Sequence, residues 1–328
     1  METAPQSTFL VTMTKPALLV IGIVLTAVNP VKAQPHAFIT NQLENTVSVI
    51  DTDSQKVIQS VRVTGKPAGV AVNPTKKQIY ISTPEGGGFA VIDSEKFTVT
   101  NTVKVGGASL GIAVDKEGKQ VFVADWYDHT ITVFDTTNFA QTAVIKVGKS
   151  PSGMTTSPDN KWLYVANRID DSISQIDLKK LHIRNTTKVG AHPFGIVVSS
   201  NGKRLYSANV ESNDVSILDG HSMKKIATIK VGARPYAVAL AMNDSVLFVT
   251  NQDDSTVSAI DTSTLKSLSI IEVGDKPEGI STHPDGRFVY VANWFDNNVS
   301  VIDAQSLKVV KTINTGEGSR AFGEFISP

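Results

Sequence analysis

Four residues that recur at intervals of 42 could together form a polar and aromatic site. They are Phe194, Tyr236, Glu278 and Arg320. A carboxylate beside a guanidinium can bind a polar ligand, and aromatic rings supply apolar contact area. The same spacing would also let Glu278 pair with Arg320 across neighbouring units while the rings pack on adjacent loops. These residues therefore leave a binding site and a structural cluster both open.

Two short segments add aromatic residues with a charge beside them. One runs from Trp126 to His129, and the other contains Trp294 and Phe295. Aromatic side chains on loops are typical of binding hot spots. The candidate ligand- or partner-binding residues are therefore Phe194, Tyr236, Glu278, Arg320, Trp126, Tyr127, Trp294 and Phe295.

The sequence gives little support for a metal site or for a catalytic nucleophile. His129 and His192 are the histidines expected on the same side as these loops, but they fall in units two apart, so they remain the only metal candidates. No nucleophile elbow, zinc-protease helix or phosphate-binding loop is present. The chain has no cysteine, which excludes thiolate zinc sites, disulfides and c-type haem attachment. We predict no cofactor, no catalytic residue and no metal site.

The charge balance argues against nucleic acid as a partner. Lysine plus arginine and aspartate plus glutamate number 31 each. No excess of positive charge is left to neutralise a phosphate backbone or an anionic membrane surface.

The elements that must position these residues form a strict internal repeat. Two sets of equivalent residues recur in steps of 42. In the first set an aspartate ends an apolar run, and in the second set a polar residue follows a strand-like run. The first set is Asp51, Asp93, Asp135, Asp177, Asp219, Asp261 and Asp303. The second is Asn41, Thr83, Asp125, Asn167, Asn209, Asn251 and Asn293. We expect the aspartates to accept hydrogen bonds from the following turn, and the glycine of each Val-Gly pair to be a turn residue with permissive φ.

Each repeat predicts four short antiparallel strands. In one unit these cover 153–156, 162–166, 173–177 and 183–189, separated by turn residues such as Ser157 to Asn160. Four-stranded sheets at this period are typical of propeller blades. Small residues recur in the first strand, as crowding around an axis requires. The prediction is an all-β, seven-bladed β-propeller whose first blade, opened near Phe38, is closed by the C-terminal strand.

The residues also resemble a known repeat. Tyr164-Val165-Ala166-Asn167 followed by Ser172 to Asp177, with the opening turn Val147-Gly148, is similar to the YVTN-type β-propeller repeat over all seven units. The resemblance implies a secreted or periplasmic propeller and is nearly silent on function. Such repeats also look like the propellers of redox assemblies, including the haem d1 domain of nitrite reductases. No ligand residue of those relatives matches a motif in this chain.

The first 33 residues differ from the repeats. Lys15, an apolar run from Ala17 to Val28 and the small residues around Ala33 predict a Sec-type signal peptide over 1–33, with Met13 as a possible true start. The run is too short to span a bilayer. We expect cleavage after Ala33, a propeller over 34–328, periplasmic or secreted location, no membrane span after cleavage, and a monomer.

The functional hypothesis is a non-enzymatic binding or scaffold module. It would present its loop-rich face to a protein, a glycan or a small ligand. Two alternatives stay open: a lactonase-like hydrolase or lyase using Glu278 or His129 with a divalent cation, and an accessory subunit of a periplasmic redox system.

Overall fold

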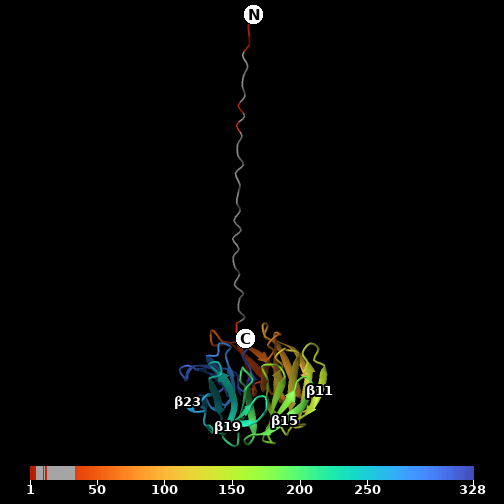
Figure 1. Ribbon diagram of the computed structural model, residues 1–328, viewed down its shortest axis with the longest axis vertical. Helices are drawn as coiled ribbons and strands as arrows, with labels where there is room; N and C mark the ends of the chain where they lie inside the picture. The colour runs from red at the N-terminus through yellow and green to blue at the C-terminus, as the bar shows by residue number, and fades with distance from the viewer. Residues whose placement is uncertain (5–9, 11, 13–33) are drawn as a thin grey trace. The chain divides into compact units, whose positions relative to one another are not determined.

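Seven β-sheets surround a common axis in the part of the chain from Gln34 to Pro328 (Figure 1). This computed structural model describes residues 1–4, 10, 12 and 34–328. The predicted all-β, seven-bladed propeller with four strands per blade is confirmed. The predicted signal peptide at 1–33, with its cleavage after Ala33 and its alternative start at Met13, falls on a segment that lies largely outside the described residues.

Each blade runs from the axis outward through four strands. The innermost strands are β4 Gly69–Val72, β8 Ser109–Val114, β12 Pro151–Thr156, β16 Pro193–Val198, β20 Pro235–Ala241, β24 Pro277–Thr282 and β28 Phe322–Glu324. The second strands are β1 His36–Asn41, β5 Gln78–Thr83, β9 Gln120–Asp125, β13 Trp162–Asn167, β17 Arg204–Asn209, β21 Val246–Asn251 and β25 Phe288–Asn293.

The third and fourth strands complete the blades. The third strands are β2 Thr46–Asp51, β6 Gly88–Asp93, β10 Thr130–Asp135, β14 Ser172–Asp177, β18 Asp214–Asp219, β22 Thr256–Asp261 and β26 Asn298–Asp303. The outer strands, four of them labelled at the periphery of Figure 1, are β3 Lys56–Arg62, β7 Thr98–Lys104, β11 Gln141–Lys146, β15 His182–Lys188, β19 Lys225–Lys230, β23 Ser267–Glu272 and β27 Lys308–Asn314. A 3₁₀ turn, η1 Pro84–Gly86, joins β5 to β6.

An aromatic residue in the middle of every second strand packs each blade against its neighbours. The seven are buried and repeat every 42 residues: Phe38, Tyr80, Phe122, Tyr164, Tyr206, Phe248 and Tyr290. Burying rings of this size supplies much of the apolar area that holds a sheet against the next one. Where the ring is tyrosine, its hydroxyl needs a partner. The Tyr164 hydroxyl donates to the Gly220 carbonyl oxygen of the next blade at 2.6 Å.

The innermost strands approach each other so closely that side chains are excluded at one position. A Cβ on Gly111 would lie 1.9 Å from the carbonyl oxygen of Ser152, and one on Gly153 would lie 2.2 Å from that of Phe194. The small residues in the first strands are therefore required by crowding at the axis, as the sequence analysis expects.

The glycines of the Val-Gly pairs need a correction. Gly106 does have a positive φ of 98°. Gly148 and Gly232, in contrast, are absent from the positive-φ residues. A Cβ on Gly148 would lie 2.6 Å from the side-chain carbon Cγ of Asn167, and one on Gly232 2.6 Å from Cγ of Asn251. In these blades glycine makes room for the buried asparagine that ends the second strand, so permissive φ is not the reason.

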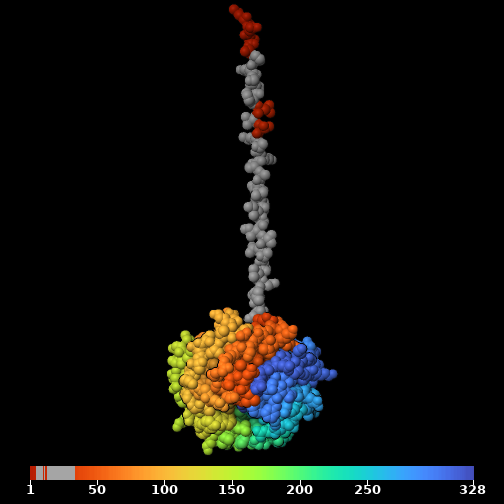
Figure 2. Space-filling model, turned by 180° about the vertical axis from the view of Figure 1, so that it is seen from behind, coloured from red at the N-terminus to blue at the C-terminus, as the bar shows by residue number. Residues whose placement is uncertain are grey.

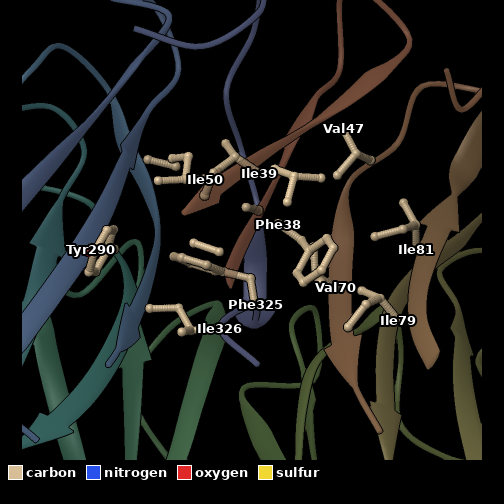
Figure 3. Close-up of a cluster of buried hydrophobic side chains, with 14 of the residues drawn as sticks. Phe38, Ile39, Val47, Ile50, Val70, Ile79, Ile81, Tyr290, Phe325 and Ile326 are labelled. Atoms are coloured by element: carbon tan, nitrogen blue, oxygen red, sulfur yellow. The ribbon is translucent and has the colours of Figure 1, made fainter. Parts of the chain in front are cut away.

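The C-terminal segment closes the ring against β1. Isolated bridges join Asn41 to Ser319 and Ala37 to Ile326, and the Phe38 amide donates to the Phe325 carbonyl oxygen at 2.8 Å. Figure 3 shows Phe325 and Ile326 packed among side chains of the first, second and seventh blades. Figure 2 shows the first and the last part of the propeller sequence side by side. Blade 1 therefore contains residues from both ends.

This closing strand is irregular. Between its two bridges to β1, the segment Phe322–Glu324 turns away and pairs in parallel with β4 of the second blade. Gly323 at the middle of this segment has φ of 105°, a conformation that glycine adopts without strain. The irregular segment narrows the central channel.

The aspartates that end the third strands bind the turns that follow. Asp51 accepts a hydrogen bond from the Ser54 amide at 2.7 Å, and Asp261 accepts from the Thr264 amide at 2.7 Å. The other five make the same kind of contact. The predicted structural role of the aspartate series is confirmed.

Stability should fall in acid over the range in which these aspartates titrate. Hydrogen bonds from Ser263 and Thr264 lower the pKa of Asp261 from 3.8 to about 2, and similar bonds lower the pKa of five others. The pKa of Asp303 is lowered chiefly by the hydrogen bond from Arg287. The folded state thus binds fewer protons than the unfolded chain in this range. The contribution of these aspartates to the free energy of unfolding is therefore present above pH 3.8 and is lost as the pH falls toward 2. Urea unfolding midpoints across this range measure the loss. An Asp261→Asn variant should show a smaller loss, and a flat profile would contradict the prediction.

Candidate functional site

One face of the disc carries all the residues singled out from the sequence. The turns between second and third strands and the crossovers into the first strands lie together at this end, joined by bonds such as Arg168 amide to Ser150 carbonyl at 3.1 Å and Trp126 amide to Ala108 carbonyl at 3.1 Å. We call it the hairpin face. Equivalent residues of the seven blades form rings on it, which differ in distance from the axis.

The floor ring closes the channel at this face. It comprises Ala68, Leu110, Ser152, Phe194, Tyr236, Glu278 and Arg320. Phe194 and Tyr236 stack with ring centroids 4.0 Å apart, and Phe322 meets Phe194 edge-on at 5.3 Å. All three rings are buried. The structure therefore brings the four sequence candidates together, but places Phe194, Tyr236 and Glu278 beneath the surface.

Glu278 and Arg320 form a buried ion pair at the centre of this floor. The Arg320 Nε and Glu278 Oε2 atoms are 2.6 Å apart, and the exposed fraction of the Glu278 side chain is 3%. Arg320 also donates to the Tyr236 hydroxyl at 2.7 Å and to Gln42 at 3.1 Å. Gln252 donates to the second carboxylate oxygen of Glu278 at 2.7 Å. Such a network is stable only because both charges are bonded on several sides.

Burial and pairing act in opposite directions on these two groups. Burial raises the pKa of Glu278 because it penalises the charged carboxylate, whereas Arg320 and Gln252 favour the charged form. Burial alone would lower the pKa of Arg320, but Glu278 and Tyr236 raise it above its ordinary value. The guanidinium is therefore charged, and its contacts leave Glu278 no free oxygen with which to act as a base.

A cavity of about 250 Å³ with a mixed polar and apolar lining lies in the channel beneath the floor ring. Its lining includes Gly153, Gly195 and Ala239 from the innermost strands, and Phe194 and Phe322 bound it on the side of the hairpin face. The floor ring thus separates this cavity from the loops above.

The wall ring stands one position after the second strands. It comprises Gln42, Pro84, Trp126, Arg168, Val210, Gln252 and Trp294. Gln42 and Gln252 bind the ion pair, while Val210 and Trp126 pack on the aromatic floor. Apart from the two tryptophans, sequence reasoning missed these residues, although aligning the repeats at this position would have found them.

The rim ring lies at the tips of the hairpins. It comprises Leu43, Glu85, Tyr127, Ile169, Glu211, Asp253 and Phe295. Four of the seven are large apolar side chains that face solvent, with exposed fractions of 72% for Tyr127, 55% for Phe295, 51% for Leu43 and 49% for Ile169. Phe295 stacks on Trp294 with centroids 5.0 Å apart. Exposed apolar side chains gathered on one face are typical of an interaction surface.

Two of the three acidic rim residues, Glu211 and Asp253, are engaged by cations of the crossovers. Arg234 contacts Glu211 at 2.9 Å and Asp253 at 3.6 Å, and Lys276 contacts Asp253 at 2.7 Å. The apolar rim residues therefore form two pairs in neighbouring blades, Phe295 with Leu43 and Tyr127 with Ile169. Glu85 separates the pairs on one side, and Glu211 with Asp253 separates them on the other.

The two candidate histidines do not converge. His129 Nδ1 accepts a hydrogen bond from the Ser150 amide at 3.1 Å, whereas His192 Nδ1 lies 3.8 Å from a carboxylate oxygen of Glu211. Within the described ranges, no three metal-ligating side chains gather at one place.

Sequence comparisons match two family descriptions. The YNCE-like beta-propeller description matches residues 206–323. The Cytochrome D1 heme domain description matches residues 26–155 and 128–241, together more than half of the chain. No curated protein sequence matches.

Solved structures with the same fold are numerous. The structure of Kuenenia stuttgartiensis hydrazine synthase is 22% identical over 81% of this chain and 91% of that chain, with a TM-score of 0.75. A Lactobacillus plantarum protein is 19% identical over 90% and 98%, with a TM-score of 0.78. Dihydro-heme d1 dehydrogenase NirN in complex with DHE is 16% identical over 85% of this chain and 63% of that chain, with a TM-score of 0.66. At these identities the likeness establishes the fold alone.

Breaking the buried ion pair should destabilise the propeller strongly. Arg320→Met leaves Glu278 buried without its cation, which should cost about 3 kcal/mol of unfolding free energy in urea. The double variant Arg320→Met/Glu278→Met removes both charges and should recover part of that loss. A double variant less stable than Arg320→Met would contradict the prediction.

Proposed function

We propose that this chain, which belongs to the seven-bladed β-propellers of the YVTN type, is an exported binding module for a partner protein. The matches to the YNCE-like and Cytochrome D1 heme domain descriptions support the family. The partner docks on the hairpin face, and the propeller acts as a rigid, non-enzymatic scaffold. The apolar rim carries this proposal, because Tyr127, Phe295, Leu43 and Ile169 expose large side chains at equivalent hairpin tips.

A protein suits this surface better than a glycan or a small ligand. Interfaces between proteins combine exposed aromatic residues with polar residues around them. The rim ring does so, because it places Tyr127 and Phe295 among charged residues. The cavity that could hold a small ligand lies beneath the buried floor ring. The rigid floor also favours docking without rearrangement, which lowers the entropic cost of binding.

Export rests on the amino-terminal residues and on the absence of cysteine. The described residues contain no helix that is both long and apolar enough to cross a bilayer. A chain without thiols is suited to an oxidising compartment. We place the mature protein in the periplasm or outside the cell.

A second candidate is an accessory role in a redox system. The match to the Cytochrome D1 heme domain favours it. The channel mouth does not fit a haem as it stands, because Phe194, Tyr236 and Phe322 fill it and contact one another. An accessory subunit would therefore contribute its surface to such a system, which is again a docking function.

A lactonase-like activity finds no support at the residues that it would need. Glu278 is bonded to Arg320 and Gln252, and His129 Nδ1 is bonded to a backbone amide. Neither side chain is free to act as a base in the manner that the alternative requires.

Position-specific crosslinking tests the docking face. A photoreactive phenylalanine analogue at Tyr127 or Phe295 should crosslink the same protein in the envelope of the native host. The analogue at Ile270 or Val310, exposed apolar positions on the outer strands, is the matched control. Capture of the same proteins from the outer strands, or of no common protein from the rim, would refute docking at this face.

The amino terminus of the exported protein tests the signal peptide separately. Protein purified from the envelope fraction should begin at Gln34, because cleavage after Ala33 removes the apolar segment. Mass spectrometry of the intact protein measures the start. A chain that retains the segment and remains in the cytoplasm would overturn the export proposal without bearing on the docking face.

A further inference from the structure

One residue of the wall ring has no partner for its charge. Arg168 lies in the hairpin between β13 and β14, at the position held by glutamine, valine, tryptophan or proline in the other blades. Its side chain is half-buried. Among the described residues, no hydrogen bond or salt bridge from its guanidinium is found, although Gln42 and Gln252 at equivalent positions are both bonded. None of its guanidinium nitrogens is among the buried unpaired atoms, so they reach the surface, where they can donate hydrogen bonds to a ligand.

The carboxylates in the same hairpin and in the next blade bind groups other than the Arg168 guanidinium. Asp170 accepts a hydrogen bond from the Lys149 amide at 2.8 Å, and Asp171 accepts one from the His192 amide at 2.8 Å. Glu211 acts on Arg168 from a distance but is held by Arg234 at 2.9 Å. These three carboxylates therefore form no ion pair with Arg168 among the described residues.

Other groups around Arg168 add to a site for an anion. His192 Nδ1 is buried and has no hydrogen-bond partner among the described residues. Burial lowers the pKa of Arg168, which reflects the cost of keeping this charge away from water. Ile169, the next residue, exposes its apolar side chain at the rim.

We propose that Arg168 is the anchor for a carboxylate presented by the partner protein, next to an apolar side chain of that partner. A guanidinium binds a carboxylate through two parallel hydrogen bonds, and a partly buried site strengthens them. The apolar neighbour of the carboxylate contacts Ile169 and the aromatic rim. This inference rests on the proposed function, because it names the chemistry that the docking face recognises.

The test uses phenylacetate as the probe, with phenylacetamide as its uncharged counterpart. The Nε–H signal of Arg168 in protein labelled with ¹⁵N-arginine, assigned by its loss in Arg168→Gln, should shift with phenylacetate and stay in place with phenylacetamide. Binding of phenylacetate, followed by the remaining protein signals, should weaken at least about tenfold in Arg168→Gln, because the charge-assisted bonds are lost. Arg168→Lys should weaken it less.

Two controls separate this site from a structural role. Lys276→Gln removes a cation of the same face that is paired with Asp253 and leaves Glu211 held by Arg234, so phenylacetate should still bind and still shift the Arg168 signal. Removing an unpaired charge should leave the thermal midpoint of Arg168→Gln unchanged or higher. Equal binding of phenylacetate and phenylacetamide, equal binding to wild type and Arg168→Gln, or a strongly lowered midpoint in Arg168→Gln would each overturn the proposal.

The two proposals can fail separately. If the protein crosslinked from Tyr127 binds Arg168→Gln as well as wild type, docking stands and the carboxylate anchor is wrong. If phenylacetate needs Arg168 but the rim crosslinks nothing in common, the anion site stands and docking of a partner protein is wrong.

Discussion

The ring can close only if seven innermost strands fit around one axis, and the other features of the propeller follow from that requirement. Glycine at Gly111 and Gly153 lets adjacent first strands approach to distances that no side chain tolerates. The C-terminal segment then bonds to β1 at both of its ends, so the last residues hold the first blade in place. Because every blade is packed between two others, loss of closure would expose the aromatic second strands on both sides of the gap.

Closure also explains why the candidate site is built as concentric rings. Each blade contributes one residue at each distance from the axis, so a change in one repeat appears at one point of a ring. The floor ring uses this to place an ion pair between two aromatic residues and two glutamines. In the wall ring, the same variation between repeats places Arg168 where no carboxylate of the described residues pairs with it. The rim ring places exposed apolar side chains in four blades and acidic side chains in the other three.

The division between rigid floor and exposed rim fits a docking function. The floor ring is largely buried and is held by the ion pair of Glu278 with Arg320, which makes it a stable base for the loops above. The rim exposes apolar rings that the fold itself does not need. Residues that contribute little to packing yet remain large and apolar at equivalent tips are better explained by a partner than by stability.

The sequence by itself determined the architecture, because a 42-residue period, strand-like runs and small first-strand residues leave few ways to bury the apolar face of every sheet. It also located the four floor residues on one face, since equivalent positions of a repeat must share a ring. The tertiary structure alone decided which of them reach solvent, because burial depends on how neighbouring blades pack. It likewise decided that the Gly148 position makes room for Asn167, and that Arg168 lacks a partner while Arg320 has several. Pairing of charges is set by distances across blades, which the period of a sequence does not contain.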